Sequence, residues 1–199
     1  MHFWKVVLTL TLILFLCPTS VTFADGKTKA AACTACHGAD GNSINPIWPS
    51  LAGQGAEYTI QQLHAFKSGA RNNPSMSPMA AGLGDEDMRE IADYFASQTP
   101  KIASMADTDY GDAERLYRGG DAERGIPACM ACHGPSGAGN GPAKFPALRG
   151  QQAEYTKLQL KAYRDGSRAT DPQGMMRSIA AKLTDDDIDR IANYLSALH

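Results

Sequence analysis

Two short stretches decide how this chain is interpreted: Cys33-Thr34-Ala35-Cys36-His37-Gly38 and its near copy Cys129-Met130-Ala131-Cys132-His133-Gly134. Each has two cysteines three residues apart and a histidine directly after the second cysteine. In a helical turn, residues three apart lie on the same face. Each stretch therefore gathers two thiols and one imidazole ring in one place, and the chain is predicted to contain two such sites.

A cysteine pair followed at once by histidine is the signature of covalent c-type haem attachment. Two thiols reach two vinyl groups on one edge of the planar ring, and the histidine then lies beneath the iron. One short segment thus supplies two covalent tethers and the proximal ligand, and we predict two haem c groups. The predicted attachment residues are Cys33, Cys36, Cys129 and Cys132, and the predicted proximal iron ligands are His37 and His133.

Cysteine pairs of this spacing also occur in thiol redox proteins and in zinc sites. The two pairs together could even build one four-cysteine zinc centre. Neither alternative accounts for His37 and His133, or for the similar sequence that follows each motif. Haem attachment is the interpretation that these residues favour.

The sequence that follows the motifs is duplicated as well. Trp48–Gln54 matches Phe145–Gln151, and Ala56–Thr59 matches Ala153–Thr156. Each unit has roughly 75 to 100 residues, a size that folds alone around a modest core. The polar segment between the units has no counterpart in either of them. We predict a first domain over 25–98, a linker over 99–112 and a second domain over 113–199.

The N-terminus has the composition of a secretory signal. Lys5 precedes an almost wholly apolar run over 6–17, and small or polar residues continue to Ala24. The run is short for a membrane span of roughly 20 residues. We predict a signal peptide over 1–24, with an uncleaved membrane anchor as the alternative. Export would place the mature chain in the periplasm and remove Cys17 with the signal.

The periodicity of the mature chain is helical. Glu57–Lys67 and Glu154–Arg164 follow this pattern, and each unit closes with a segment whose acidic start complements the positive end of a helix dipole. Thr184 is predicted to cap the last helix together with Asp187. No segment alternates with period two, so we predict an all-α fold. The apolar stripes expected on the closing helices are Met88, Ile91, Ala92 and Phe95, and Ile188, Ile191, Ala192 and Leu195.

Haem iron takes a sixth ligand or stays open to small molecules, and the soft thioether of methionine favours ferrous iron. Counted back from the matched Leu83 and Leu183, Met76 and Met176 occupy the same position, seven residues earlier. We predict that these two methionines are the sixth ligands. The alternatives are Met79 and Met175.

A ligating histidine usually donates its other ring N–H to a fixed acceptor. Pro49 and Pro146 begin the matched Pro-x-Leu-x-Gly segments shortly after each motif. Their carbonyl oxygens are predicted to accept from His37 and His133. In the alternative, each proline only shapes its loop.

The sequence resembles the cytochrome c4 family over nearly the whole mature chain. This resemblance implies two tandem domains similar to class I cytochrome c, in a pseudo-twofold arrangement with the haems facing one another. It also implies periplasmic electron transfer from a quinol-oxidising complex or another donor, with a haem–copper oxidase as acceptor. The residues that carry it are Cys33–Gly38, Gly41–Ser43, Trp48–Gln54, Met76, Cys129–Gly134, Phe145–Gln151 and Met176.

We expect an electron carrier and not an enzyme. A two-haem peroxidase would need one iron with an open position and acid–base groups beside it, whereas both units offer a matched methionine. A third hypothesis is an oxidase subunit held by an uncleaved anchor. Without that anchor, membrane contact is expected only through partners. The formal net charge of −2 gives no reason to expect a nucleic-acid partner.

Overall fold

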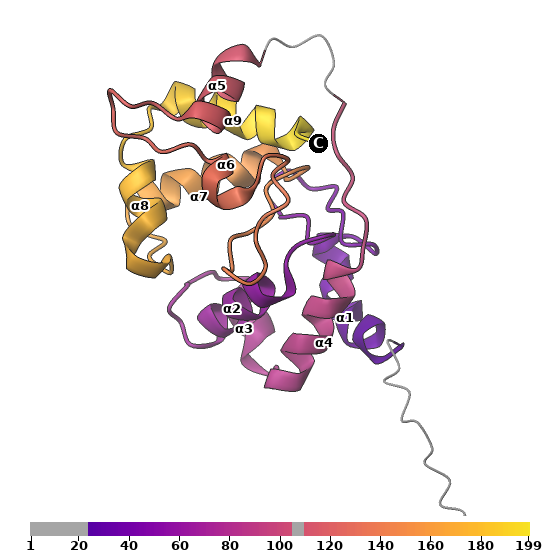
Figure 1. The fold of residues 1–199 in the computed structure, drawn as a ribbon. Helices are drawn as coiled ribbons and strands as arrows, with labels where there is room; N and C mark the ends of the chain where they lie inside the picture. The colour runs from indigo at the N-terminus through magenta and orange to yellow at the C-terminus, as the bar shows by residue number, and fades with distance from the viewer. Residues whose placement is uncertain (1–23, 105–109) are drawn as a thin grey trace, which may run out of the picture.

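The computed structural model describes residues 24–104 and 110–199, which form two helical units (Figure 1). The signal peptide predicted over 1–24 lies, apart from Ala24, outside the described residues, and it stays a prediction. Among the described helices, none combines the length and the apolar character that crossing a membrane requires.

The first unit, drawn from indigo to magenta in Figure 1, carries its cysteine motif in the last turn of helix α1. Helix α1 packs on α4, and α2 packs against both α4 and α3. The helices of this unit are α1 (Ala24–His37), α2 (Ala56–Lys67), α3 (Met76–Ala81) and α4 (Asp85–Ala96).

The second unit repeats this arrangement with one difference, which lies before its motif. The single helix α1 is replaced by α5 and α6, and the loop between them contains an isolated β-bridge from Asp121 to Ile126. Helix α9 packs on α5 and α7, and α7 packs on α8. The elements are α5 (Gly111–Gly119), α6 (Met130–His133), α7 (Ala153–Arg164), the 3-10 turn η1 (Pro172–Gly174), α8 (Met175–Ala180) and α9 (Asp185–Ala197).

The prediction of an all-α fold is confirmed. The described residues contain no strand, and their only β pairings are the bridge in the α5–α6 loop and a second bridge between Asn140 and Phe145. The apolar stripes predicted on the two closing helices are buried along their whole length.

The starts of the two closing helices differ in a way that the sequence explains. At α9, Thr184 and Asp187 form the predicted capping box: the Asp187 N–H donates to Thr184 Oγ1 at 3.1 Å, and the Thr184 N–H donates to Asp187 Oδ2 at 2.8 Å. At α4 the cap position is Gly84, which has no side chain. Only the reverse bond, from the Gly84 N–H to Asp87 Oδ2, forms there at 2.9 Å.

Each unit has its own apolar core. In the first unit, Ala30 of α1 packs against Ile91 and Phe95 of α4, and Cys33 lies at the edge of this cluster. In the second unit, Tyr117 of α5 packs against α9, with Cys129 at the edge. The first cysteine of each motif is therefore held by the core that joins the opening and closing helices.

The units meet through loops and through helices α2 and α7. The segment after α4 runs along the second unit, where the Ala103 N–H donates to the Ser196 carbonyl at 3.0 Å (Figure 1). The Tyr155 N–H of α7 donates to the Pro46 carbonyl of the first unit at 3.0 Å. The second of these contacts places the loop after the first cysteine motif at the boundary between the units.

Candidate haem-binding sites

Each cysteine motif forms one turn of helix, as its spacing predicts. Cys33, Cys36 and His37 lie in the last turn of α1, while Cys129 is the residue immediately before α6. The His133 N–H donates to the Cys129 carbonyl at 3.0 Å, which closes the second turn. In both units the first cysteine is half-buried, the second is exposed and the histidine is buried. Two thiols and an imidazole ring are thus brought together at one end of each unit.

Both histidines donate to the predicted proline carbonyls. His37 Nδ1 lies 2.8 Å from the Pro49 oxygen, and His133 Nδ1 lies 2.9 Å from the Pro146 oxygen. A carbonyl oxygen only accepts, so Nδ1 carries the proton in both rings and Nε2 keeps a free lone pair. The prediction that these prolines are acceptors is confirmed.

Burial of the two imidazole rings favours their neutral form. It lowers the pKa of His37 and of His133, although the hydrogen bond to the proline carbonyl by itself would raise them. A metal ligand has to be the neutral imidazole, because the bonding lone pair is otherwise protonated. Both rings are therefore prepared to bind iron through Nε2.

The four cysteines within the described residues are free thiols, with no disulfide among them. Burial raises the pKa of Cys33, helped by the neighbouring Cys36, and burial raises the pKa of Cys129 to about 11. Zinc binding requires thiolates, which these pKa shifts oppose. Within the described ranges, no group of three or more histidine, cysteine or acidic side chains is placed to hold a metal ion. The structure thus gives the four-cysteine zinc alternative no support.

The two predicted methionines lie at matching places in the structure. Met76 is the first residue of α3 and Met176 is the second residue of α8, and both are partly buried. The alternatives are more open to solvent, with Met79 48% exposed and Met175 36% exposed. Met88 is fully buried in α4, where it fills the core.

An acceptor side chain directly before a proline holds the loop that leads to each methionine. In the first unit, Asn73 Oδ1 accepts from the Met76 N–H at 2.9 Å. In the second unit, Asp171 Oδ2 accepts from the Arg177 N–H at 3.0 Å, and Asp171 Oδ1 accepts from Arg177 Nε at 2.8 Å. The Asp171 side chain is only 2% exposed. The second methionine loop therefore carries a buried carboxylate before its proline, whereas the first carries an exposed neutral amide.

Two buried guanidiniums meet where the units face one another. Arg71 Nη2 donates across the boundary to Gln159 Oε1 at 2.7 Å, and Arg168 Nη2 donates across it to Gln62 Oε1 at 3.0 Å. Among the described residues, the side-chain hydrogen-bond acceptors of both groups are neutral and none is a carboxylate. These acceptors are Gln62, Gln159, Tyr58 and Tyr155.

The residues present fit haem c. Buried charges are normally paired, yet the Nε atoms of Arg168 and of Arg149 are buried without a hydrogen-bond partner in the described part of the chain. Haem carries two carboxylates that suit such donors. Leu158 on α7 is 48% exposed and offers apolar surface of the kind a porphyrin ring covers. The thiols, neutral imidazoles and thioethers complete the donor set that haem c requires.

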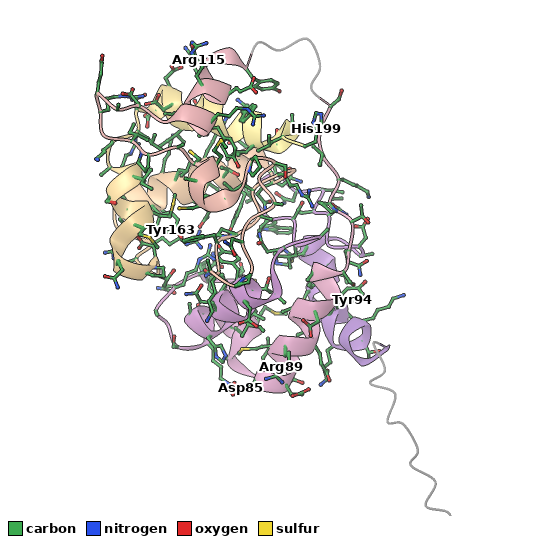
Figure 2. The ribbon with its side chains drawn as sticks, in the orientation of Figure 1. Asp85, Arg89, Tyr94, Arg115, Tyr163 and His199 are labelled. Atoms are coloured by element: carbon green, nitrogen blue, oxygen red, sulfur yellow. The ribbon has the colours of Figure 1, made fainter. Side chains whose placement is uncertain are left out.

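The other histidines lie apart from this chemistry. His64 is about half exposed, 3.9 Å from Asp85 near the outer end of α4. His199 is at the surface where the chain ends, as Figure 2 shows, and its Nδ1 lies 3.0 Å from the Ala197 carbonyl. Both histidines are exposed and neither follows a cysteine pair, unlike His37 and His133.

Several residues at these sites were missed by reasoning from the sequence. Asn73 and Asp171 share a detectable signal, because each directly precedes a proline just before its methionine. Gln54 and Gln151 end the duplicated Pro-x-Leu-x-Gly-Gln segment, yet nothing local to that segment says what their side chains contact. Their partners lie in the other unit.

Comparisons with known proteins agree with this geometry. The sequence model of the cytochrome c family matches the chain twice, over residues 23–99 and 100–199. Cytochrome c4 of Thiocapsa roseopersicina is 49% identical over 87% of this chain and 91% of its own length. A protein of Thiomonas intermedia named thiosulfate dehydrogenase electron acceptor is 42% identical over 96% of this chain and 88% of its own length.

Solved structures show the same likeness. The crystal structure of reduced recombinant cytochrome c4 from Pseudomonas stutzeri matches with a TM-score of 0.85 and 41% identity, and the match covers 90% of this chain and all of that one. A thiosulfate dehydrogenase from Marichromatium purpuratum matches with a TM-score of 0.79 and 34% identity. That match covers 88% of this chain but only 40% of the other protein.

Proposed function

Because the chain belongs to the cytochrome c4 family and is a dihaem electron-transfer protein, we propose that it works in the periplasm of a bacterium. There it accepts electrons from a quinol-oxidising complex or another respiratory donor and passes them to a haem–copper oxidase. The signal-like composition of residues 1–24 supports this location, and membrane contact would then occur only through partners.

The proposal assigns every attachment and ligand residue. One haem is bound by Cys33 and Cys36 with His37 and Met76 on the iron. The second haem is bound in the same way by the matched residues. These are Cys129, Cys132, His133 and Met176.

The observation that carries the proposal is the repeated pair of histidine-to-proline hydrogen bonds, at 2.8 Å and 2.9 Å. Each fixes the ring plane and the tautomer of the proximal ligand. The haem iron supplies reversible one-electron chemistry, which the protein tunes through ligand identity, burial and hydrogen bonding. Met76 and Met176 would supply the second protein ligand of each iron, which would leave no vacant site for peroxide. Because the same ligands would serve both oxidation states, electron transfer would cost little rearrangement.

A second candidate donor comes from the relatives. Two of them are named thiosulfate dehydrogenase electron acceptor, and at 42% and 44% identity they cover most of this chain. A thiosulfate-oxidising enzyme is therefore the alternative source of electrons. Oxidation of thiosulfate releases electrons to a one-electron carrier of this kind, while the chain itself transforms no substrate.

The test uses the purified mature dihaem protein. Mass spectrometry after acid extraction should retain two haem masses, and the reduced protein should be reoxidised by membranes that contain a haem–copper oxidase. Loss of one or both haem masses on extraction would contradict the assignment of the four cysteines as attachment residues. Rapid peroxide consumption, or a five-coordinate high-spin haem in the resting spectrum, would show that the protein is a peroxidase and not an electron carrier.

A further inference from the structure

Each unit clamps the proline loop of the other through one glutamine side chain. Gln151 Oε1 accepts from the Ser50 N–H at 2.8 Å, and Gln151 Nε2 donates to the Ser50 carbonyl at 2.9 Å. In the mirror contact, Gln54 Oε1 accepts from the Ala147 N–H at 2.8 Å, and Gln54 Nε2 donates to the Ala147 carbonyl at 3.0 Å. The two amides thus make reciprocal bridges across the boundary between the units.

The peptide group that each glutamine touches also binds a proximal histidine. Ser50 follows Pro49 directly, so the Ser50 N–H and the Pro49 carbonyl belong to one peptide group. This group accepts from His37 Nδ1 on one side and donates to Gln151 on the other. The next unit repeats the arrangement with Pro146 and Ala147.

Hydrogen bonds in a chain polarise one another. When the peptide N–H donates to a glutamine, the carbonyl of the same peptide becomes a stronger acceptor. A stronger acceptor draws the Nδ1 proton of the histidine and makes Nε2 more basic toward the iron. More electron density on the iron stabilises the ferric state and lowers the reduction potential.

Solvent cannot easily replace these glutamines. Gln151 is 9% exposed and His37 behind it is 6% exposed. Gln54 and His133 are both 7% exposed. Both glutamine oxygens also accept from a following N–H, that of Gly55 or of Gln152, at 3.0 Å and 2.9 Å. Each side chain is therefore fixed in the orientation that receives the proline-loop N–H.

We propose that Gln151 is a positioning residue for His37 and that Gln54 is the positioning residue for His133. Each unit thereby sets the strength of the proximal ligand in the other unit, and the potential of each haem depends on a side chain outside its own domain. This inference rests on the proposed dihaem function and deepens it.

The chain offers a matched control. Gln152 Nε2 also donates across the boundary, to the Ser43 carbonyl at 2.5 Å, but it does not touch a peptide group that binds a histidine. Gln152→Ala removes one hydrogen bond between the units and leaves both proline peptides intact. This variant therefore shows whether a shift in potential comes from a weaker interface or from loss of the glutamine contact to the proline peptide.

The experiment measures the individual potentials of the two haems in Gln151→Ala, Gln54→Ala and Gln152→Ala by spectroelectrochemistry. Nuclear magnetic resonance assigns each haem, and it also follows the exchange rate of each histidine Nδ1 proton. Gln151→Ala should raise the potential of the haem bound at Cys33 and speed exchange at His37, while the other haem is unchanged. Gln54→Ala should raise the potential of the haem bound at Cys129 and speed exchange at His133, while the first haem is unchanged. Gln152→Ala should leave both potentials equal to those of the wild type within experimental error.

Equal shifts of both haems in every variant, or shifts confined to the domain that carries the substitution, would overturn the inference. If an alanine variant does not fold, Gln151→Met and Gln54→Met keep the side-chain length and remove the amide, with the same expected shifts. The proposed function is judged separately on the wild type. Two haems that titrate reversibly without cross-domain shifts would refute only the glutamine pathway.

Discussion

Arg168 of the second unit donates a hydrogen bond to the hydroxyl of Tyr58 in the first unit at 2.8 Å. Arg71 returns the contact to Tyr155 at 3.0 Å. Burial by itself would raise the pKa of Tyr58, but the positive charges of Arg168 and Arg71 lower it. The boundary between the units is thus held in part by hydrogen bonds from charged guanidinium groups to neutral acceptors.

We expect Tyr58→Phe to destabilise the dihaem protein by about 1.5–3 kcal/mol, the range for a hydrogen bond to a charged group. The control is Tyr94→Phe, because the Tyr94 hydroxyl donates to the neutral Ala39 carbonyl at 3.1 Å. That loss should cost only about 0.5–1.5 kcal/mol. Denaturant unfolding monitored by circular dichroism compares the two, and equal losses would mean that the Arg168 contact has no special weight.

Met76→Ala and Met176→Ala should each lower the potential of one haem and leave the other nearly unchanged, because the thioether stabilises ferrous iron. Met79→Ala and Met175→Ala serve as controls, since both side chains are substantially exposed. Potentials are read by redox titration, and the weak red sulfur-to-iron charge-transfer band should fall by about half in each ligand variant. If the controls behave as the ligand variants are expected to, the assignment of the methionines is wrong.

The sequence predicts features that depend on residues close together in the chain. The helical turn at Cys33–His37 and the Thr184 cap follow from residue type and spacing alone. The roles of Gln54 and Gln151 do not, because each acts on a loop about a hundred residues away that only docking of the two units brings near. The separate helix α6 was also not expected, since an insertion before the second motif interrupts the helix that the first unit keeps whole.

Asp171→Asn should raise the potential of the haem in the second unit. Asparagine keeps an acceptor for the Arg177 N–H but removes the negative charge, so the Arg177 guanidinium is left without its carboxylate partner and the added net positive charge would disfavour ferric iron. Asn73→Asp adds a carboxylate before the proline of the first loop and should lower the potential of the first haem by a smaller amount, because Asn73 is exposed and solvent screens the added charge. Spectroelectrochemistry of both variants tests the pair, and shifts in the same direction would contradict the electrostatic explanation.

The stability of the protein should fall between pH 4 and pH 2, partly through Asp187. Burial by itself would raise the pKa of this carboxyl, but hydrogen bonds from Arg124 and Thr184 lower it to about 2. A carboxyl whose folded pKa lies below its unfolded value of about 3.8 stabilises the fold above pH 3.8, and this contribution disappears as the pH falls toward 2.

Asp187→Asn should therefore be less stable than the wild type at pH 6 and should approach it at pH 2. Urea unfolding at a series of pH values measures the difference. Parallel pH profiles for the two proteins would show that Asp187 does not contribute to the acid sensitivity.

Gly41 and Gly69 both have a left-handed backbone, and replacement by alanine is expected to destabilise the fold more at Gly41 than at Gly69. Gly41 has φ +76° and Gly69 has φ +77°. A Cβ at Gly41 would lie 2.8 Å from both the Ala52 nitrogen and the Phe95 ring, whereas a Cβ at Gly69 would have nothing within 4 Å. Alanine at either position pays for the left-handed conformation, about 1–2 kcal/mol, but only Gly41→Ala adds about 1–3 kcal/mol of overpacking.

The Gly41 substitution should also reach the first haem. The Gly41 carbonyl accepts from the Leu51 and Ala52 N–H groups at 2.7 Å and 3.0 Å, so it anchors the loop that begins at Pro49. Displacement of this loop weakens the acceptor of His37 and raises the potential of the first haem, while Gly69→Ala leaves it unchanged. Unfolding and redox titration of the two variants separate the effects: a large loss of stability without a shift in potential would mean that the loop moves without disturbing the histidine.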